Sequence, residues 1–345
     1  MKFQEGLVIL MTKQDCTTSN VTFMEEPTAQ LFEDFSVPEF AKGNIVYNEL
    51  KKVEMIARVC YKSEANALDL SDEDSFKKTA KFISMLLIRK HYAMFEHSVF
   101  HFKIRIKYVN SYYLIRDFFN NSRYCYVDSI YDKEHYLCVT TNLRFILESK
   151  YSLATQCLKE EIWKELYKVV EDSSSFHSLF HAFFAYDDKH YNGVSAELCT
   201  PTEQEYDSGV FEKYHTFCFT TDRGVTHELV RHRVASYAQE STRYCTYNKD
   251  ITFMIPAQFD TFPENMKKSW KDFMIKCAQE YRELIDSGVT PQNARSVLPN
   301  SLATKIVMTV SEEELKHVLC LRYEGITGAP HPDMKALMKK VKEIL

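Results

Sequence analysis

The sequence predicts an α+β protein, because segments with the alternation of half-buried strands and segments with the spacing of amphipathic helices occur along one chain. The alternation is clearest at residues 98–107, where apolar residues occupy every second position. Shorter strands are expected at 214–220 and 251–255. Helices are expected at residues 48–60, from Ser71 to 87, at 158–170, at 266–284 and at 334–341.

Composition limits the classes of protein that the chain can represent. With 345 residues, of which 45% are hydrophobic, it is long enough to bury a large core in one or two domains. Its formal net charge of −5 argues against a general nucleic-acid binder, whose surface is normally basic. No apolar run reaches membrane-spanning length, so we expect no membrane partner.

The ten cysteines and eight glycines are scattered along the chain. No Cys-x-x-Cys occurs, which favours unpaired thiols in a reducing cytoplasm and gives no zinc motif. His177 and His181 have metal-ligand spacing, but the phenylalanines around them favour core packing, so we expect no metal. Neither Gly-x-Gly nor Gly-x-x-x-x-Gly-Lys occurs, which excludes a Rossmann fingerprint and a P-loop.

Residues 226–244 hold the densest group of chemically informative side chains. Three arginines and several hydroxyls fall close together, in the order Arg231, His232, Arg233, seven further residues, Ser241, Thr242 and Arg243. Arginine presents a planar fork of donors that matches phosphate or the edge of a pyrimidine, so this segment is a candidate anion site. The same spacing also fits a solvated helix face whose arginines pair with Glu228 and Glu240.

The start of this segment has helical features. Thr226 follows a turn-forming Asp-Arg-Gly and is expected to cap a helix. That helix would direct Leu229, Val230 and Val234 toward apolar partners. Glu228 would share a helix face with Arg231, three residues later.

The spacing of Arg-His-Arg, Ser and Arg resembles the signature of the flavin-dependent thymidylate synthases, the ThyX family. Further motifs similar to that family follow the family order, namely Ala57-Arg58-Val59-Cys60-Tyr61, His91 with Phe95-Glu96-His97, Ala294-Arg295-x-x-Leu298-Pro299 and Leu319-Cys320-Leu321-Arg322. The resemblance runs over about residues 48–106 and 214–342. It implies an antiparallel sheet flanked by helices.

The intervening stretch matches no part of the family pattern. We therefore expect three parts, with 1–107 as the N-terminal part of a ThyX-like domain, 108–212 as a mainly helical insertion and 213–345 as the C-terminal part that carries the signature. The resemblance also implies a homotetramer with sites at subunit interfaces.

The activity that the resemblance implies is the reductive methylation of dUMP to dTMP. The small-molecule substrate is dUMP, methylenetetrahydrofolate donates the one-carbon unit, and FAD passes on the hydride that NADPH supplies. Arg322 matches the arginine that binds the uracil edge and helps to ionise its N3 atom, so it is the expected catalytic residue. Ser241 is expected to donate or accept hydrogen bonds rather than act as a nucleophile.

The resemblance also implies the binding residues. Those expected at the flavin are His91, Ala93, Arg231, His232, Arg233, Gln239, Ser311, Glu313 and His317. Those expected at dUMP are Glu228, Arg231, Gln239, Glu240, Ser241, Thr242, Arg243, Arg295 and Arg322. Glu96 and His97 are expected at the mouth of the site.

One position departs from the family pattern. Where the family commonly has Asn-x-Arg at the flavin, this chain has Ser311-Glu312-Glu313, which fits a helix cap with acids in the first turn. The inserted Asn142-Leu143-Arg144 is a candidate source of the missing groups. The departure leaves an alternative open, a ThyX-like sensor or scaffold that binds flavin or nucleotide and uses the insertion to bind a partner.

Overall fold

The computed structural model describes residues 21–33, 37–64, 72–131, 135–149, 153–170, 193–247 and 250–345. The predicted cap at Ser71 and the histidines His177 and His181 lie outside the described residues. Among the described residues, no group of three or more His, Cys, Asp or Glu side chains is arranged to hold a metal ion. No helix in this described part is both long and apolar enough to cross a membrane.

A central antiparallel sheet carries the signature segment. Its strands occur in the order β2 (Thr28–Leu31), β7 (Tyr214–Asp222), β10 (Ala303–Ser311) and β8 (Ala235–Gln239). In the register, Met308 of β10 lies between Phe217 of β7 and Tyr237 of β8. β7 confirms the strand predicted at 214–220, whereas β8 occupies residues that we had not assigned to a strand.

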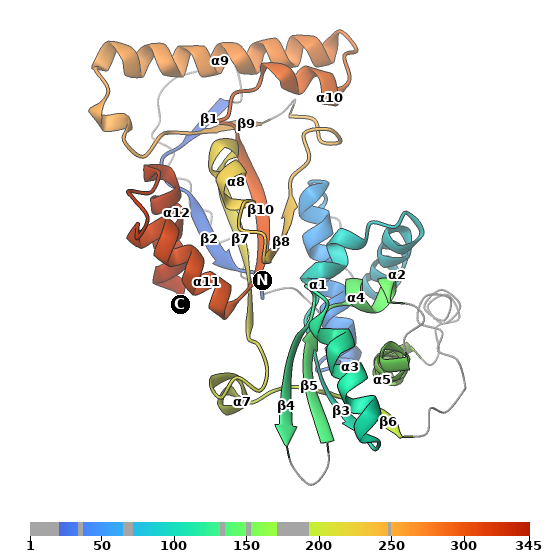
Figure 1. The fold of residues 1–345 in the computed structure, drawn as a ribbon. Helices are drawn as coiled ribbons and strands as arrows, with labels where there is room; N and C mark the ends of the chain where they lie inside the picture. The colour runs from blue at the N-terminus through green and yellow to red at the C-terminus, as the bar shows by residue number, and fades with distance from the viewer. Residues whose placement is uncertain are drawn as a thin grey trace.

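Helices cover both faces of this sheet (Figure 1). Side chains at alternating positions, such as Phe217, Phe219 and Met308, pack against α8 (Arg223–Leu229), α11 (Glu312–Leu319) and α12 (Pro332–Ile344). The intervening Cys218, Val307 and Ala238 face α1 (Ile45–Cys60). The expected architecture of an antiparallel sheet flanked by helices is confirmed.

A second antiparallel sheet has the order β4 (Tyr126–Tyr131), β5 (His135–Thr141), β3 (Phe100–Ile106) and β6 (Val194–Cys199). Its buried face shares one core with α1, α2 (Asp72–Ile88), α3 (Val109–Asn120), α4 (Leu143–Glu148) and α5 (Leu153–Val170). Segment 108–212 therefore supplies strands as well as helices, and two of these strands flank the predicted strand β3.

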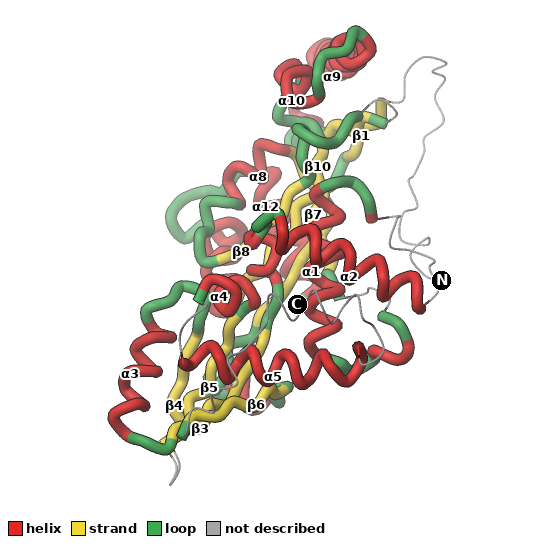
Figure 2. Tube along the Cα trace, turned by 90° about the vertical axis from the view of Figure 1, so that its right-hand side faces the viewer, coloured by secondary structure: helices red, strands yellow, loops and turns green. Residues whose placement is uncertain are grey.

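A smaller unit lies at the other end of the central sheet, as Figures 1 and 2 both show. Here β1 (Val21–Met24) pairs in parallel with β9 (Ile251–Met254) beneath the long helix α9 (Glu264–Asp286). α10 (Pro291–Ala294) and a 3₁₀ turn, Arg295–Val297, follow it. The helix predicted at 266–284 and the strand predicted at 251–255 are confirmed.

The start of the signature segment differs from the prediction. Asp222, not Thr226, caps α8, because its carboxylate accepts the backbone N–H of Val225 at 2.8 Å. The helix ends at Leu229, and Val234 is 66% exposed instead of packed against apolar partners. Val230 is exposed as well, and Arg231 lies beyond the helix, so it does not share a helix face with Glu228. The chain must leave the helix here to enter β8, whose pairing with β10 outweighs the local helical preference.

Candidate functional site

Arg322 lies in a π-helical turn, Cys320–Glu324, directly after α11. Its Nη1 atom is 3.3 Å from Glu228 Oε2, and its Nε atom donates to His232 Nε2 at 3.1 Å. The fold thus joins the motif near the C-terminus to two residues of the signature segment. Two contacts on different atoms fix the plane of the guanidinium, and other N–H groups remain for a ligand.

His232 is buried beside this arginine. Burial, with the nearby positive charges of Arg322 and His317, lowers the pKa of His232 to about 4, so the ring is neutral at neutral pH. Since arginine can only donate, Nε2 of His232 must accept and Nδ1 must carry the proton. Nδ1 is 3.9 Å from Glu314 Oε1, in the first turn of α11. The acidic start of α11 therefore faces this histidine.

The exposed arginines of the signature segment form no ion pair with an acidic side chain among the described residues. Arg231 and Arg233 are exposed, and neither side chain contacts an acidic group among the described residues. Arg243 is exposed and lies over the ring of Tyr244, with 5.2 Å between the guanidinium carbon and the ring centroid. The salt-bridged helix face, which was the alternative to an anion site, is not formed by these three side chains.

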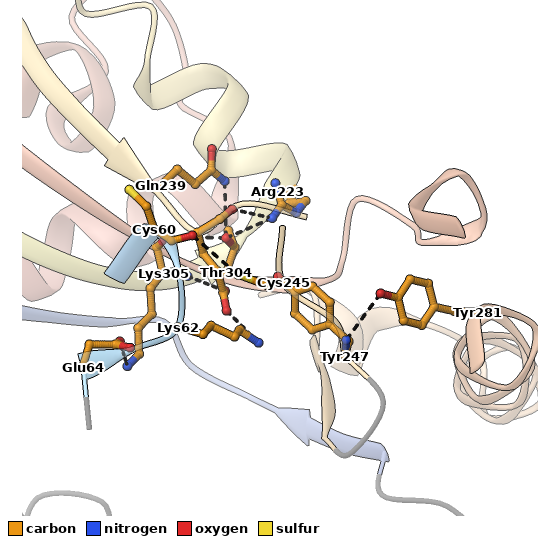
Figure 3. Close-up of polar contacts among 11 residues, drawn as sticks. Cys60, Lys62, Glu64, Arg223, Gln239, Cys245, Tyr247, Tyr281, Thr304 and Lys305 are labelled. Carbon is orange, nitrogen blue, oxygen red and sulfur yellow. Dashed lines mark hydrogen bonds and ion pairs between the residues drawn. The ribbon is translucent and has the colours of Figure 1, made fainter. Parts of the chain in front are cut away.

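The end of β8 is held by polar contacts with α8 and with Lys62, which lies just after α1 (Figure 3). Gln239 donates to Thr226 Oγ1 at 3.0 Å, and the buried Glu240 pairs with Lys62 Nζ at 2.6 Å. Arg223 Nη2 donates to the backbone oxygen of Glu240 at 3.0 Å. Gln239 and Glu240 thus have partners within the chain.

Sequence reasoning missed Lys62. It directly follows the motif Ala57–Tyr61, has a left-handed backbone with φ of 49°, and lies over the ring of Tyr247 at 3.7 Å. Burial lowers the pKa of Lys62. Its place after the motif was the available signal, but only the tertiary structure brings it to Glu240.

Several of the residues expected at dUMP form a second group. The backbone N–H of Ser241 donates to the Cys60 carbonyl at 3.0 Å, and Ser241 Oγ accepts the N–H of Arg243 at 3.2 Å. Arg295 Nη1 donates to Thr242 Oγ1 at 3.3 Å. The structure therefore brings Arg295 to the signature segment, whereas Glu228 pairs with Arg322.

A pocket of about 460 Å³ opens on the α1 side of the central sheet. His91 and Ala93, both exposed, line it together with residues from the end of α1, the 3₁₀ segment Tyr92–His97 and α4. Tyr61 Oη lies 3.4 Å from His91 Nδ1. Of the inserted Asn142-Leu143-Arg144, only Arg144 lines the pocket, since Asn142 caps α4 and Leu143 is buried.

Glu96 and His97 have different environments. Glu96 forms an ion pair with Arg144 and accepts a hydrogen bond from Ser236 of β8 at 3.1 Å. His97 is fully buried instead of lying at the mouth of a site, and its Nδ1 atom is 2.8 Å from Thr309 Oγ1. Burial lowers the pKa of His97 to about 3. The contact with Thr309 places His97 against β10 of the central sheet.

The residues expected at the flavin fall into two groups within one chain. His232 and the exposed His317 lie on the side of the sheet covered by α8 and α11, whereas His91 and Ala93 lie on the α1 side. Ser311 is buried and caps α11 by accepting the N–H of Glu314 at 3.3 Å. Glu313 is exposed. The Ser311 cap predicted from the sequence is confirmed.

Known proteins are similar to two stretches of this chain, and both stretches contribute residues to the candidate site. The family model described as thymidylate synthase complementing protein matches residues 45–117 and 201–345. Proteins named flavin-dependent thymidylate synthase are similar to the chain. The one from Thermococcus onnurineus is 46% identical over 103 residues, which is 29% of this chain and 42% of the relative. The one from Geobacter sulfurreducens is 42% identical over 101 residues, or 29% of this chain and 43% of the relative.

The chain spans about half the length of these curated relatives. A solved structure of the UMP/dUMP methylase PolB from Streptomyces cacaoi, bound with 5-Br dUMP, has 22% identity and a TM-score of 0.35, and the match covers 41% of this chain and 70% of that one. That overall agreement is too low to carry an argument. The family match, in contrast, extends over more than half of the chain and includes the motifs at residues 57–61, 91–97, 231–243, 294–299 and 319–322. This protein therefore belongs to the thymidylate synthase complementing protein family.

Proposed function

We propose that the protein is a flavin-dependent thymidylate synthase that converts dUMP to dTMP with methylenetetrahydrofolate, FAD and NADPH. The observation that carries the proposal is the contact of Arg322 with Glu228 and His232, since it assembles a fixed cation from two separate family motifs. Relatives with this name, about 40% identical over part of the chain, support the same activity.

Arg322 would act on the uracil ring. A guanidinium held by two partners needs little reorganisation when negative charge develops on a bound ring, so it stabilises the transition state more than the ground state. His232 is neutral and accepts a hydrogen bond from Arg322. It therefore orients the guanidinium without adding a second positive charge or neutralising the first. Glu228 is the second partner and contacts a different nitrogen, Nη1.

The phosphate of dUMP would be bound by the second group of residues. Arg295 supplies positive charge next to the Thr242 hydroxyl, and Arg243 is an exposed cation two residues after Ser241. Charge-assisted hydrogen bonds from arginine to phosphate are stronger than neutral ones. Ser241 has no basic side chain in hydrogen-bond contact among the described residues, and we assign it a hydrogen-bonding role.

The pocket beside His91 fits part of a flavin nucleotide. Tyr61, Tyr92 and Met94 provide apolar and aromatic walls, while Lys90 and Arg144 provide positive charge. Its volume lies in the range typical of ligand pockets. These residues would hold the flavin, which would supply hydride transfer from NADPH to the one-carbon unit that the folate delivers. The chain itself binds, orients and supplies charge.

A homotetramer with shared sites is part of the proposal. His91 and Arg322, both expected to serve one reaction, lie on opposite faces of the central sheet. Mixing His91→Ala and Arg322→Ala subunits after partial unfolding and refolding should restore activity that neither variant has alone, because some sites would receive both intact residues. Mixtures with no activity above the separate variants would argue against shared sites.

The activity is tested by the visible spectrum of the purified protein reconstituted with FAD. NADPH added without oxygen should bleach the flavin bands, and the bands should return only when dUMP and methylenetetrahydrofolate are both added. dTMP is then measured by chromatography. The proposal would be contradicted if the protein cannot be loaded with FAD. It would also be contradicted if the reduced flavin is not reoxidised after dUMP and methylenetetrahydrofolate are added.

One observation favours a second candidate function. Ser311 uses its side-chain oxygen to cap α11 and is buried, and Glu313 puts a negative charge where the family commonly has an arginine. A family member that binds flavin or dUMP as a sensor, without turnover, could carry these two changes, because it would not need the catalytic flavin contacts. Flavin loading without dUMP-dependent reoxidation would identify that case.

A further inference from the structure

Arg144 lies in a part of the chain that the family model does not match. That part includes α4 and separates the matched residues 45–117 from 201–345. The side chain of Arg144 nevertheless lines the pocket beside His91 and Ala93. A segment absent from the family pattern thus forms one wall of a pocket built from family motifs.

The Arg144 side chain is held in place. Nη1 forms an ion pair with Glu96, and Nε donates to Glu148 Oε1 at 3.1 Å. The guanidinium also lies 5.4 Å from the ring centroid of Tyr124. Only 24% of the side chain is exposed. Arginine has five N–H donors, so this arrangement fixes the group and leaves others for a ligand.

The other walls of the pocket indicate the class of ligand. Lys90, beside His91, has an exposed side chain that pairs with no acidic group among the described residues. Its backbone has φ of 55°, which places it at the turn that ends α2. Tyr61, Tyr92 and Met94 give the remaining surface an aromatic and apolar character. An unpaired cation and a fixed guanidinium beside aromatic walls suit a phosphorylated ring compound.

We infer that Arg144, together with Lys90, binds the pyrophosphate of the flavin nucleotide in this pocket. The inference rests on the proposed function for the identity of the nucleotide. α4 then serves as a binding element, and the inserted segment contributes directly to cofactor affinity. Glu148 opposes this binding, because it occupies one donor of Arg144 and adds a negative charge to the pocket wall.

Three probes separate phosphate binding from a structural role of Arg144. FAD has the ring and the pyrophosphate, ADP has a pyrophosphate without the flavin ring, and riboflavin has the flavin ring without phosphate. Binding of each to the full-length protein is measured by isothermal titration calorimetry, with flavin fluorescence as a second readout. The variants are Arg144→Ala and Glu148→Gln. Arg116→Ala on α3 is the control, because that arginine does not line the pocket.

Arg144→Ala should weaken FAD and ADP binding by about tenfold or more, as expected for the loss of a hydrogen bond to a charged group, and leave riboflavin binding unchanged. Glu148→Gln should strengthen FAD and ADP binding. Arg116→Ala should match the wild-type protein. Opposite effects of the two pocket variants are not expected from a general loss of structure, since both remove the same ion pair.

Unchanged FAD affinity in Arg144→Ala, or an equal loss of riboflavin affinity, would overturn the inference while leaving the proposed function intact. If the wild-type protein binds no FAD, the proposed function fails. ADP binding that depends on Arg144 would then still support an anion site at α4. A protein that binds neither FAD nor ADP would overturn both.

Discussion

Arg322 and His232 show how a few atoms define the chemistry of this site. The hydrogen bond from Arg322 Nε fixes the tautomer of His232, and the buried, neutral ring leaves the guanidinium as the positive group of the cluster. The sequence identified both residues by resemblance. Their contact depends on the π-helical turn that carries Arg322, and the approach of Glu314 to His232 depends on the first turn of α11.

Removing the Arg322 guanidinium should abolish most turnover without preventing flavin loading. We expect Arg322→Ala to lower kcat/KM for dUMP by roughly 100-fold or more, the usual scale for losing a preorganised charge at a developing anion. Flavin content is checked by the visible spectrum and dTMP by chromatography. Near-normal dTMP formation would refute the assignment. Lys316→Ala serves as the control, because this residue is exposed and lies on α11, the helix that precedes Arg322.

Buried histidines should make the protein less stable in mild acid. The folded-state pKa values of His97, His101 and His232 are lowered from 6.5 to about 3, 4 and 4, mainly by burial. The unfolded chain therefore binds more protons once the pH falls below 6.5. Stability is lost from there down to the folded pKa values, by up to about 1.4 kcal/mol per pH unit for each histidine.

His101→Gln tests this pH dependence away from the candidate site. His101 lies between Thr140 Oγ1 at 3.0 Å and Tyr206 Oη at 3.1 Å, contacts that an amide can partly replace. Urea unfolding between about pH 6.5 and 5, above the range where most carboxylates titrate, should give a smaller pH slope for the variant. A slope equal to that of the wild-type protein would contradict the contribution of His101.

At the scale of elements, α1 is organised around a buried acid. Glu54 is completely buried and binds Lys51 Nζ at 2.9 Å, Arg58 Nε at 2.8 Å and Thr79 Oγ1 of α2 at 2.6 Å. Arg58 belongs to the family-like motif at the end of α1, yet its side chain pairs with the buried Glu54 and so has a structural role. The helical spacing predicted α1, but the spacing of charges did not reveal that they point inward.

Replacing Glu54 should destabilise the α1–α2 pair strongly. Glu54→Gln leaves Lys51 and Arg58 without a buried counter-charge, which typically costs about 3–5 kcal/mol. Glu160→Gln removes the exposed contact with Lys164 on α5 and should change stability by less than about 1 kcal/mol. Both are measured by chemical denaturation. A small loss for Glu54→Gln would show that the cluster contributes little.

At the scale of the molecule, segment 108–212 is part of the core. β5 and β6 pair with the two edges of β3, and α4 and α5 pack in the same apolar cluster as α1 and α2. Its boundaries as an insertion remain a prediction from the resemblance. Whatever their origin, these residues cover apolar surface that the rest of the chain would otherwise expose.

Deleting residues 108–212 should therefore prevent folding rather than isolate a minimal enzyme. Joining 107 to 213 by a short linker would leave both edges of β3 unpaired and uncover Phe100, Phe102 and Ile104. We expect the deletion variant to aggregate on expression. Its thermal unfolding, measured by circular dichroism, should show no cooperative transition. A monodisperse deletion variant with native secondary structure would contradict this prediction.

The sequence by itself determined the main helices, three of the strands and the residues of the signature, because periodic burial and motif spacing are local properties. It misjudged the end of α8, because the pairing of β8 with β10 lies outside that local window, and it placed the cap at Thr226 although Asp222 caps the helix. Only the tertiary structure decided which charged groups meet. Arg322 with Glu228 and His232, Lys62 with Glu240, and Arg144 with Glu96 are each separated along the chain by dozens of residues or more, and packing alone brings them within hydrogen-bonding or ion-pairing distance.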